Sequence, residues 1–64
     1  MAHGEVTHFD EEGGYGFIET EDVDEDVFFH MTDIGGPDLE EGREVDFEYE
    51  DGDKGPRVTE LDRL

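Results

Sequence analysis

Residues 44–50 alternate between acidic and apolar side chains without interruption, and the apolar positions are Val45, Phe47 and Tyr49. Because successive side chains of a strand point to opposite faces, this pattern predicts a half-buried strand with one solvated face. No segment of the chain shows a sustained helical period, so a long helix is not expected. The alternation therefore favours an all-β fold.

Four further short runs have strand character and are separated by turns rich in Gly and acidic residues, which favours a small barrel or sandwich. These runs comprise residues 5–9, 15–20, 26–30 and 57–61. Residues 32–42 contain Gly35, Gly36, Pro37 and Gly42, so they are expected to form a connection. In the last run, Val58 and Leu61 are three residues apart and share a face only if a bulge or strong coiling intervenes.

The second and third runs carry aromatic residues on the face opposite to their aliphatic residues. Ile18 has the opposite parity to Tyr15 and Phe17, and Val27 has the opposite parity to Phe28 and His30. If the aliphatic side is the core, these rings lie on the outer face, and parity adds Phe9 to them. A domain of this size has no second layer to cover that face, so the rings predict a binding surface.

The same parity argument predicts the core. The residues expected there are Val6, Ile18, Val27, Phe29, Ile34, Leu39, Val45, Phe47, Tyr49, Val58 and Leu61. Ile34 and Leu39 come from the connection and are expected to cover one end of the fold.

The charge of the chain is extreme, because 22 acidic residues face 4 Lys or Arg and give a formal net charge of −18 over 64 residues. Low hydrophobicity with such a charge is typical of disorder, but here the apolar residues are patterned rather than diluted. At about 1 M salt the Debye length is roughly 3 Å, and repulsion between exposed carboxylates largely vanishes. We therefore expect a single domain spanning residues 1–64 that folds when its charges are screened, as in a high-salt cytoplasm.

Nothing in the chain predicts secretion or membrane insertion. No apolar run approaches the length of a membrane span, and the N-terminus lacks a basic segment followed by an apolar one. Cys is absent, so no disulfide framework is expected. A cytoplasmic location without membrane contact is the expectation.

Several segments resemble the cold-shock domain family. Residues 14–18 are similar to its first RNA-binding motif, residues 27–31 to its second, and residues 4–10 to its first strand, where the family pattern is G-x-V-K-W-F-N. Residues 39–42, 45–48 and 54–56 also fit, so the resemblance runs from about Gly4 to Leu61 with the motifs in family order.

This resemblance implies a five-stranded antiparallel barrel of the oligonucleotide-binding (OB) type, whose outer aromatic residues stack on unpaired bases of single-stranded RNA or DNA. It also implies an RNA chaperone of the cold-shock response, with little sequence preference, and a monomer is expected. The residues at family binding positions are Phe9, Tyr15, Phe17, Phe28 and His30 for stacking, Lys54 for a phosphate contact, and His8 and Met31 where the family usually has Trp and Phe.

The chain departs from the family in its basic residues. Gly13 and Thr7 stand where the family usually has Lys, and the net charge repels a polyanion at low salt. Stacking survives at high salt, where that repulsion is screened. We therefore expect binding to strengthen as salt rises, which is opposite to the usual response of nucleic-acid binders.

Two other classes of function remain open from the residues alone. An acidic domain can mimic nucleic acid and bind a basic protein, and an aromatic patch can bind a peptide; exposed aromatic residues argue against the mimic.

Catalysis is not expected, because Ser and Cys are absent and no apolar pocket is evident to raise the pKa of a carboxyl group. Residues 22–26 lack the spacing of a calcium loop, and His3, His8 and His30 lack metal-ligand spacing, so we expect no metal, cofactor or small-molecule substrate.

Overall fold

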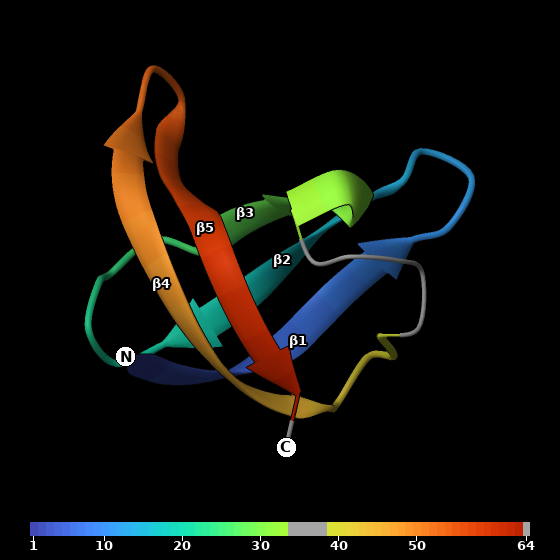
Figure 1. Ribbon diagram of the computed structural model, residues 1–64, viewed down its shortest axis with the longest axis horizontal. Coiled ribbons are helices and arrows are strands. Elements are labelled where there is room, and N and C mark those ends of the chain that lie inside the picture. The colour runs from blue at the N-terminus through green and yellow to red at the C-terminus, as the bar shows by residue number, and fades with distance from the viewer. Residues whose placement is uncertain (34–38, 64) are drawn as a thin grey trace.

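The computed structural model describes residues 1–33 and 39–63, and in these residues five strands form a closed barrel (Figure 1). Around the barrel the strand order is β1-β2-β3-β5-β4, and β4 pairs with β1 to close it. A 3₁₀ turn, η1, follows β3 directly. The elements are β1 Ala2–Asp10, β2 Tyr15–Thr20, β3 Val27–His30, η1 Met31–Asp33, β4 Glu44–Gly52 and β5 Gly55–Arg63.

The strand pairing confirms the expected all-β barrel and adds one parallel contact. β1 is antiparallel to β2 and to β4, β2 is antiparallel to β3, and β4 is antiparallel to β5. The contact between β3 and β5 is parallel and is formed through Phe28 and Arg57. This contact brings the start of β5 alongside β3 and places Arg57 next to Phe28.

The predicted irregularity in the last strand is a β-bulge. Glu60 pairs with Glu48, but Val58 pairs with Tyr49, so Thr59 is the extra residue in β5. A bulge moves the following residues to the other face of the strand. Val58 and Leu61 are consequently both buried, although they are three residues apart.

The barrel interior confirms most of the predicted core. In the part of the chain that the structure describes, ten apolar residues are buried there: Ala2, Val6, Ile18, Val27, Phe29, Leu39, Val45, Phe47, Val58 and Leu61. Tyr49 was expected among them and is only partly buried, since it lies past the bulge toward the end of the β4–β5 hairpin. Ala2 was not predicted; β1 begins at Ala2, which pairs with Phe47 and shares its inward face. The predicted core residue Ile34 lies outside the described residues.

The N-terminal part of β1 is attached to β4 by a histidine between two carboxylates. His3 Nδ1 lies 2.9 Å from Asp46 Oδ1, and His3 Nε2 lies 3.6 Å from Glu44 Oε1. The hydrogen bond to Asp46 and the charges of both carboxylates raise the pKa of His3 above its usual value of 6.5. Folding therefore makes protonation of His3 more favourable than it is in the unfolded chain.

We expect His3 to make folding stability depend on pH. Because its folded-state pKa is raised, its contribution is complete below the unfolded-state pKa and is lost as pH rises through the folded-state pKa. Thermal unfolding of the wild type and of His3→Gln, compared from about pH 6 to about pH 8.5 at constant salt, should show the difference in melting temperature shrink as pH rises. Parallel pH profiles of the two proteins would contradict this.

Candidate nucleic-acid interface

Four rings from three adjacent strands meet on the outer face of the barrel, and we call this group the aromatic surface: His8, Tyr15, Phe17 and Phe28. The Phe17 and Phe28 ring centroids are 5.8 Å apart, those of Tyr15 and Phe28 are 6.0 Å apart, and those of Tyr15 and Phe17 are 6.2 Å apart. His8 lies 6.4 Å from Tyr15 and 6.3 Å from Phe17. These spacings lie within the range of favourable aromatic pairs, so the rings hold one another in place.

Strand register explains why these rings come together. His8 pairs with Phe17, and Phe17 pairs with Phe28, so the three side chains form a row across β1, β2 and β3. The inner face of the same strands carries the fully buried Ile18 and Phe29. The row therefore rests on a packed core while its rings stay partly or largely exposed.

Gly16 allows this close packing behind the aromatic surface. A Cβ atom at Gly16 would overlap the backbone oxygen of His8 and the ring of Phe29. Any other residue there would push β1 or the Phe29 ring out of place. The glycine between Tyr15 and Phe17 is thus required by a close approach of neighbouring groups.

The structure corrects the expected orientation of Phe9. Parity placed Phe9 on the outer face, but β1 has a register shift between Val6 and His8, so Thr7 is an extra residue. The shift turns Phe9 toward the core, where its ring stacks on Phe29 at 5.7 Å and 24°. His8 takes the outer position opposite Phe17 instead.

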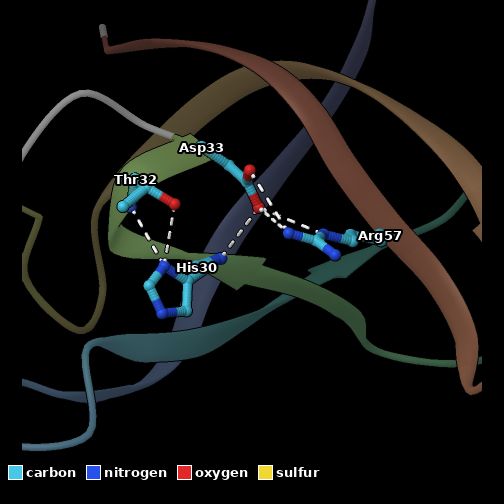
Figure 2. Close-up of polar contacts among 4 residues, drawn as sticks. All are labelled: His30, Thr32, Asp33 and Arg57. Atoms are coloured by element: carbon cyan, nitrogen blue, oxygen red, sulfur yellow. Dashed lines mark hydrogen bonds and ion pairs between the residues drawn. The ribbon is translucent and has the colours of Figure 1, made fainter.

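His30 pairs with Tyr15 at the edge of the aromatic surface, and η1 fixes its ring (Figure 2). The backbone N–H of Thr32 donates to His30 Nδ1 at 3.2 Å, and the Thr32 hydroxyl lies 2.9 Å from the same nitrogen. Since the backbone group is always a donor, Nδ1 accepts, and the proton of the neutral ring is on Nε2. His30 therefore offers an N–H donor as well as a ring face.

The remaining predicted residues lie around this surface. The Met31 N–H donates to the Gly14 carbonyl at 2.7 Å, which places Met31 against the β1–β2 turn. Lys54 is exposed in the β4–β5 turn. It lines a hollow of about 440 Å³ together with Phe28, Gly52, Asp53, Gly55, Pro56 and Arg57. Phe28 thus belongs both to the aromatic surface and to the lining of this hollow, which includes the basic side chains of Lys54 and Arg57.

A larger hollow, of about 770 Å³, lies elsewhere and offers no stacking platform. It is lined chiefly by acidic side chains, among them Glu5, Glu19 and Glu44.

Among the residues that the structure describes, no group of three or more His, Asp or Glu side chains is arranged to hold a metal ion. The described residues also contain no helix long and apolar enough to cross a membrane.

One pair of residues beside the surface had no signal in the sequence. Arg57 and Asp33 form an ion pair at 3.1 Å, although they are 24 residues apart. Their proximity follows from the parallel β3–β5 contact, which short-range patterns do not predict.

Comparison with known proteins gives consistent matches over the whole chain. The family model described as 'Cold-shock' DNA-binding domain matches residues 2–64. "Cold shock protein CspD" of Bacillus subtilis (strain 168) and "Cold shock protein CspB" of Geobacillus stearothermophilus are each 46% identical to this chain over 67 residues, with both sequences covered completely. "Major cold shock protein" of Streptococcus pyogenes is 43% identical and is covered to 98%.

A solved structure shows the same fold at low sequence similarity. The structure titled "drosophila Unr CSD456" superposes with a TM-score of 0.79 at 20% identity. The match covers 98% of this chain and 26% of that one. The likeness therefore concerns the fold of one domain within a longer protein.

Proposed function

Since this chain belongs to the cold-shock domain family, we propose that its aromatic surface binds single-stranded RNA or DNA by stacking unpaired bases on the exposed rings. The observation that carries the proposal is the cluster of Tyr15, Phe17 and Phe28 rings, spaced about 6 Å apart on the outer face over a packed core. Stacking contributes about 1–3 kcal/mol per base and is tolerant of sequence, because every base has a π-face.

Other residues extend this surface. Beside His8, which completes the row within the surface, His30 adds an edge position with an N–H donor at Nε2. Lys54 lines the same hollow as Phe28, and we expect its ammonium group to contact a phosphate there. Met31 adds apolar contact, and Phe9 contributes chiefly by supporting Phe29.

The proposed action is that of an RNA chaperone in the cold-shock response, and it requires no catalysis. Bases that leave a duplex find the aromatic surface, and their binding shifts the population toward open strands. The protein acts as a monomer in the cytoplasm, without a cofactor or a small-molecule substrate. The net charge of −18 limits affinity for a polyanion at low salt, so binding strengthens as carboxylate repulsion is screened.

An alternative partner is a basic protein. The outer faces of β4 and β5 carry paired carboxylates, Asp46 with Asp62 and Glu48 with Glu60, and such rows resemble a polyanion. A mimic of nucleic acid has no use for exposed aromatic rings, and a peptide-binding module would use the rings but not select single strands over duplex. The comparison of single-strand and duplex binding therefore separates the single-strand binder from the other two.

We expect Phe17→Leu to weaken single-strand binding about tenfold, because it removes a π-face while retaining apolar bulk. Phe9→Leu is the matched control, since its partly buried ring stacks on Phe29 and packs against the core, and it should weaken binding less than threefold. Fluorescence anisotropy with a labelled oligothymidylate in molar KCl measures both. Equal losses for the two variants would contradict the assignment of the surface.

A further inference from the structure

Arg57 lies where β5 meets the aromatic surface. It pairs with Phe28 in the parallel β3–β5 contact, and both side chains line the hollow that contains Lys54. A cation beside a stacking ring can hold the phosphodiester of a nucleotide whose base stacks on that ring. By its position, Arg57 is therefore suited to a phosphate contact.

The Arg57 guanidinium already has an anionic partner within the chain. Nε and Nη2 donate to Asp33 Oδ2 at 3.2 and 3.1 Å, and Nη2 lies 3.4 Å from Asp33 Oδ1. Arginine binds phosphates through the same forked arrangement of N–H groups. Figure 2 shows the carboxylate between the His30 backbone and the guanidinium.

Asp33 is held in this position from its other side as well. Its Oδ2 accepts the backbone N–H of His30 at 3.3 Å, which ties the carboxylate to the end of β3. The Asp33 side chain is 22% exposed, whereas the Arg57 side chain is 51% exposed. The carboxylate is thus fixed and partly enclosed, while the guanidinium remains accessible to a second anion.

We propose that Asp33 is an internal competitor for phosphate, whose carboxylate occupies the donors of Arg57 that a phosphodiester of bound single-stranded nucleic acid would take. The inference rests on the proposed single-strand binding and names the residue that sets its strength. A bound strand gains a contact with Arg57 only by sharing or displacing Asp33. Lys54 makes no ion pair with the described residues, so it offers its charge to a phosphate without such competition.

The variant Asp33→Asn tests this directly, because an amide oxygen can still accept the His30 N–H while the charge is removed. We expect it to bind a labelled oligothymidylate about fivefold more tightly than the wild type at roughly 0.5 M KCl. The slope of log affinity against log salt should become more negative by about 0.7, as for one further neutralised phosphate. A merely structural role for Asp33 would not produce this change in slope.

Two further variants serve as controls. Asp62→Asn removes the same charge from an exposed position on β5 opposite Asp46, remote from Arg57, and should change affinity less than about twofold. The double variant Asp33→Asn/Arg57→Gln should return to wild-type affinity, because the released cation is then absent. Circular dichroism of each sample establishes that the compared proteins are folded.

The outcomes separate this inference from the proposed function. If the folded wild type and every variant fail to bind, single-strand binding is wrong and the competitor role with it. If the wild type binds but Asp33→Asn matches Asp62→Asn or binds more weakly, only the competitor role is overturned.

A measurement on the wild type makes the test independent of any variant's folding. The side-chain Nε–H signal of Arg57 in NMR spectra should shift on saturation with oligothymidylate, because the guanidinium exchanges or shares its partner. An Arg57 signal that stays unchanged at saturation would overturn the proposal.

Discussion

Phe47→Ala is expected to unfold the protein at room temperature even in molar salt. The Phe47 side chain is completely buried at the centre of the barrel, and β1 and β5 pair with β4 at this residue. Truncating a buried Phe to Ala costs about 3–5 kcal/mol. A domain of this length has only about 3–10 kcal/mol of total stability. Because a chain this small buries a limited share of its surface, we expect a value toward the lower end, and the loss then removes most or all of it.

The matched variant is Phe17→Ala, which deletes the same ring from the outer face. Because Phe17 is partly exposed and rests on the core rather than within it, this variant should retain its fold and lose single-strand affinity. Far-UV circular dichroism and urea titration of both variants in about 3 M KCl measure the difference. Equal loss of structure would show that the assignment of inner and outer faces is wrong.

The second large effect is expected from salt itself. Cross-strand neighbours on the outer faces are repeatedly both acidic: Glu5 faces Glu19 and Glu44, and Glu48 faces Glu60. Like charges directly opposite each other destabilise a sheet by up to about 1 kcal/mol per pair. With a net charge of −18 added to these local repulsions, the chain should be largely unfolded in about 10 mM KCl and folded above about 1 M.

Glu60→Lys tests whether the register of the carboxylates matters. It converts the Glu48–Glu60 repulsion into an attraction and should raise the melting temperature by about 5 °C at roughly 0.2 M KCl. The gain should nearly vanish at about 3 M, where the Debye length is below 3 Å. Thermal unfolding followed by circular dichroism measures both values.

Glu11→Lys is the control for net charge. It makes the same change of charge in the exposed turn between β1 and β2, where no strand residue lies opposite. Its gain in melting temperature should be clearly smaller than that of Glu60→Lys. Equal gains would mean that net charge alone, and not cross-strand pairing, limits stability.

Alternation and motif order predicted the strands, most of the core and the position of the aromatic surface. This worked because period-two alternation directly reflects which face of a strand is buried. The alternation in β4 is regular, and the opposed parity of Ile18 and Phe17 identified the inner and outer faces correctly.

Parity failed for Phe9 because it assumes an uninterrupted strand. A single extra residue at Thr7 exchanges the faces that Phe9 and His8 occupy, and nothing in the local sequence marks that bulge. The bulge at Thr59 was predictable only because Val58 and Leu61 both needed burial. Ala2 was missed since one small residue beyond the recognised run carries little hydrophobic signal.

The Asp33–Arg57 ion pair was beyond prediction for a different reason. The ion pair depends on a parallel contact between β3 and β5, and β4 lies between these two strands in the sequence. In a chain with 22 acidic residues, no charge pattern singles out one carboxylate as the partner of Arg57. The proximity of Asp33 and Arg57 therefore becomes visible only in the three-dimensional structure, where β3 and β5 are paired.

The proposed aromatic surface has to bind unpaired bases despite the net charge of −18. Anisotropy of a labelled oligothymidylate, titrated with the protein at KCl concentrations from about 0.2 to about 3 M and with a duplex as control, tests it most directly. We expect saturable single-strand binding that strengthens with salt and is absent for duplex. A folded protein that binds neither, or whose single-strand binding falls steeply as salt rises, would contradict it.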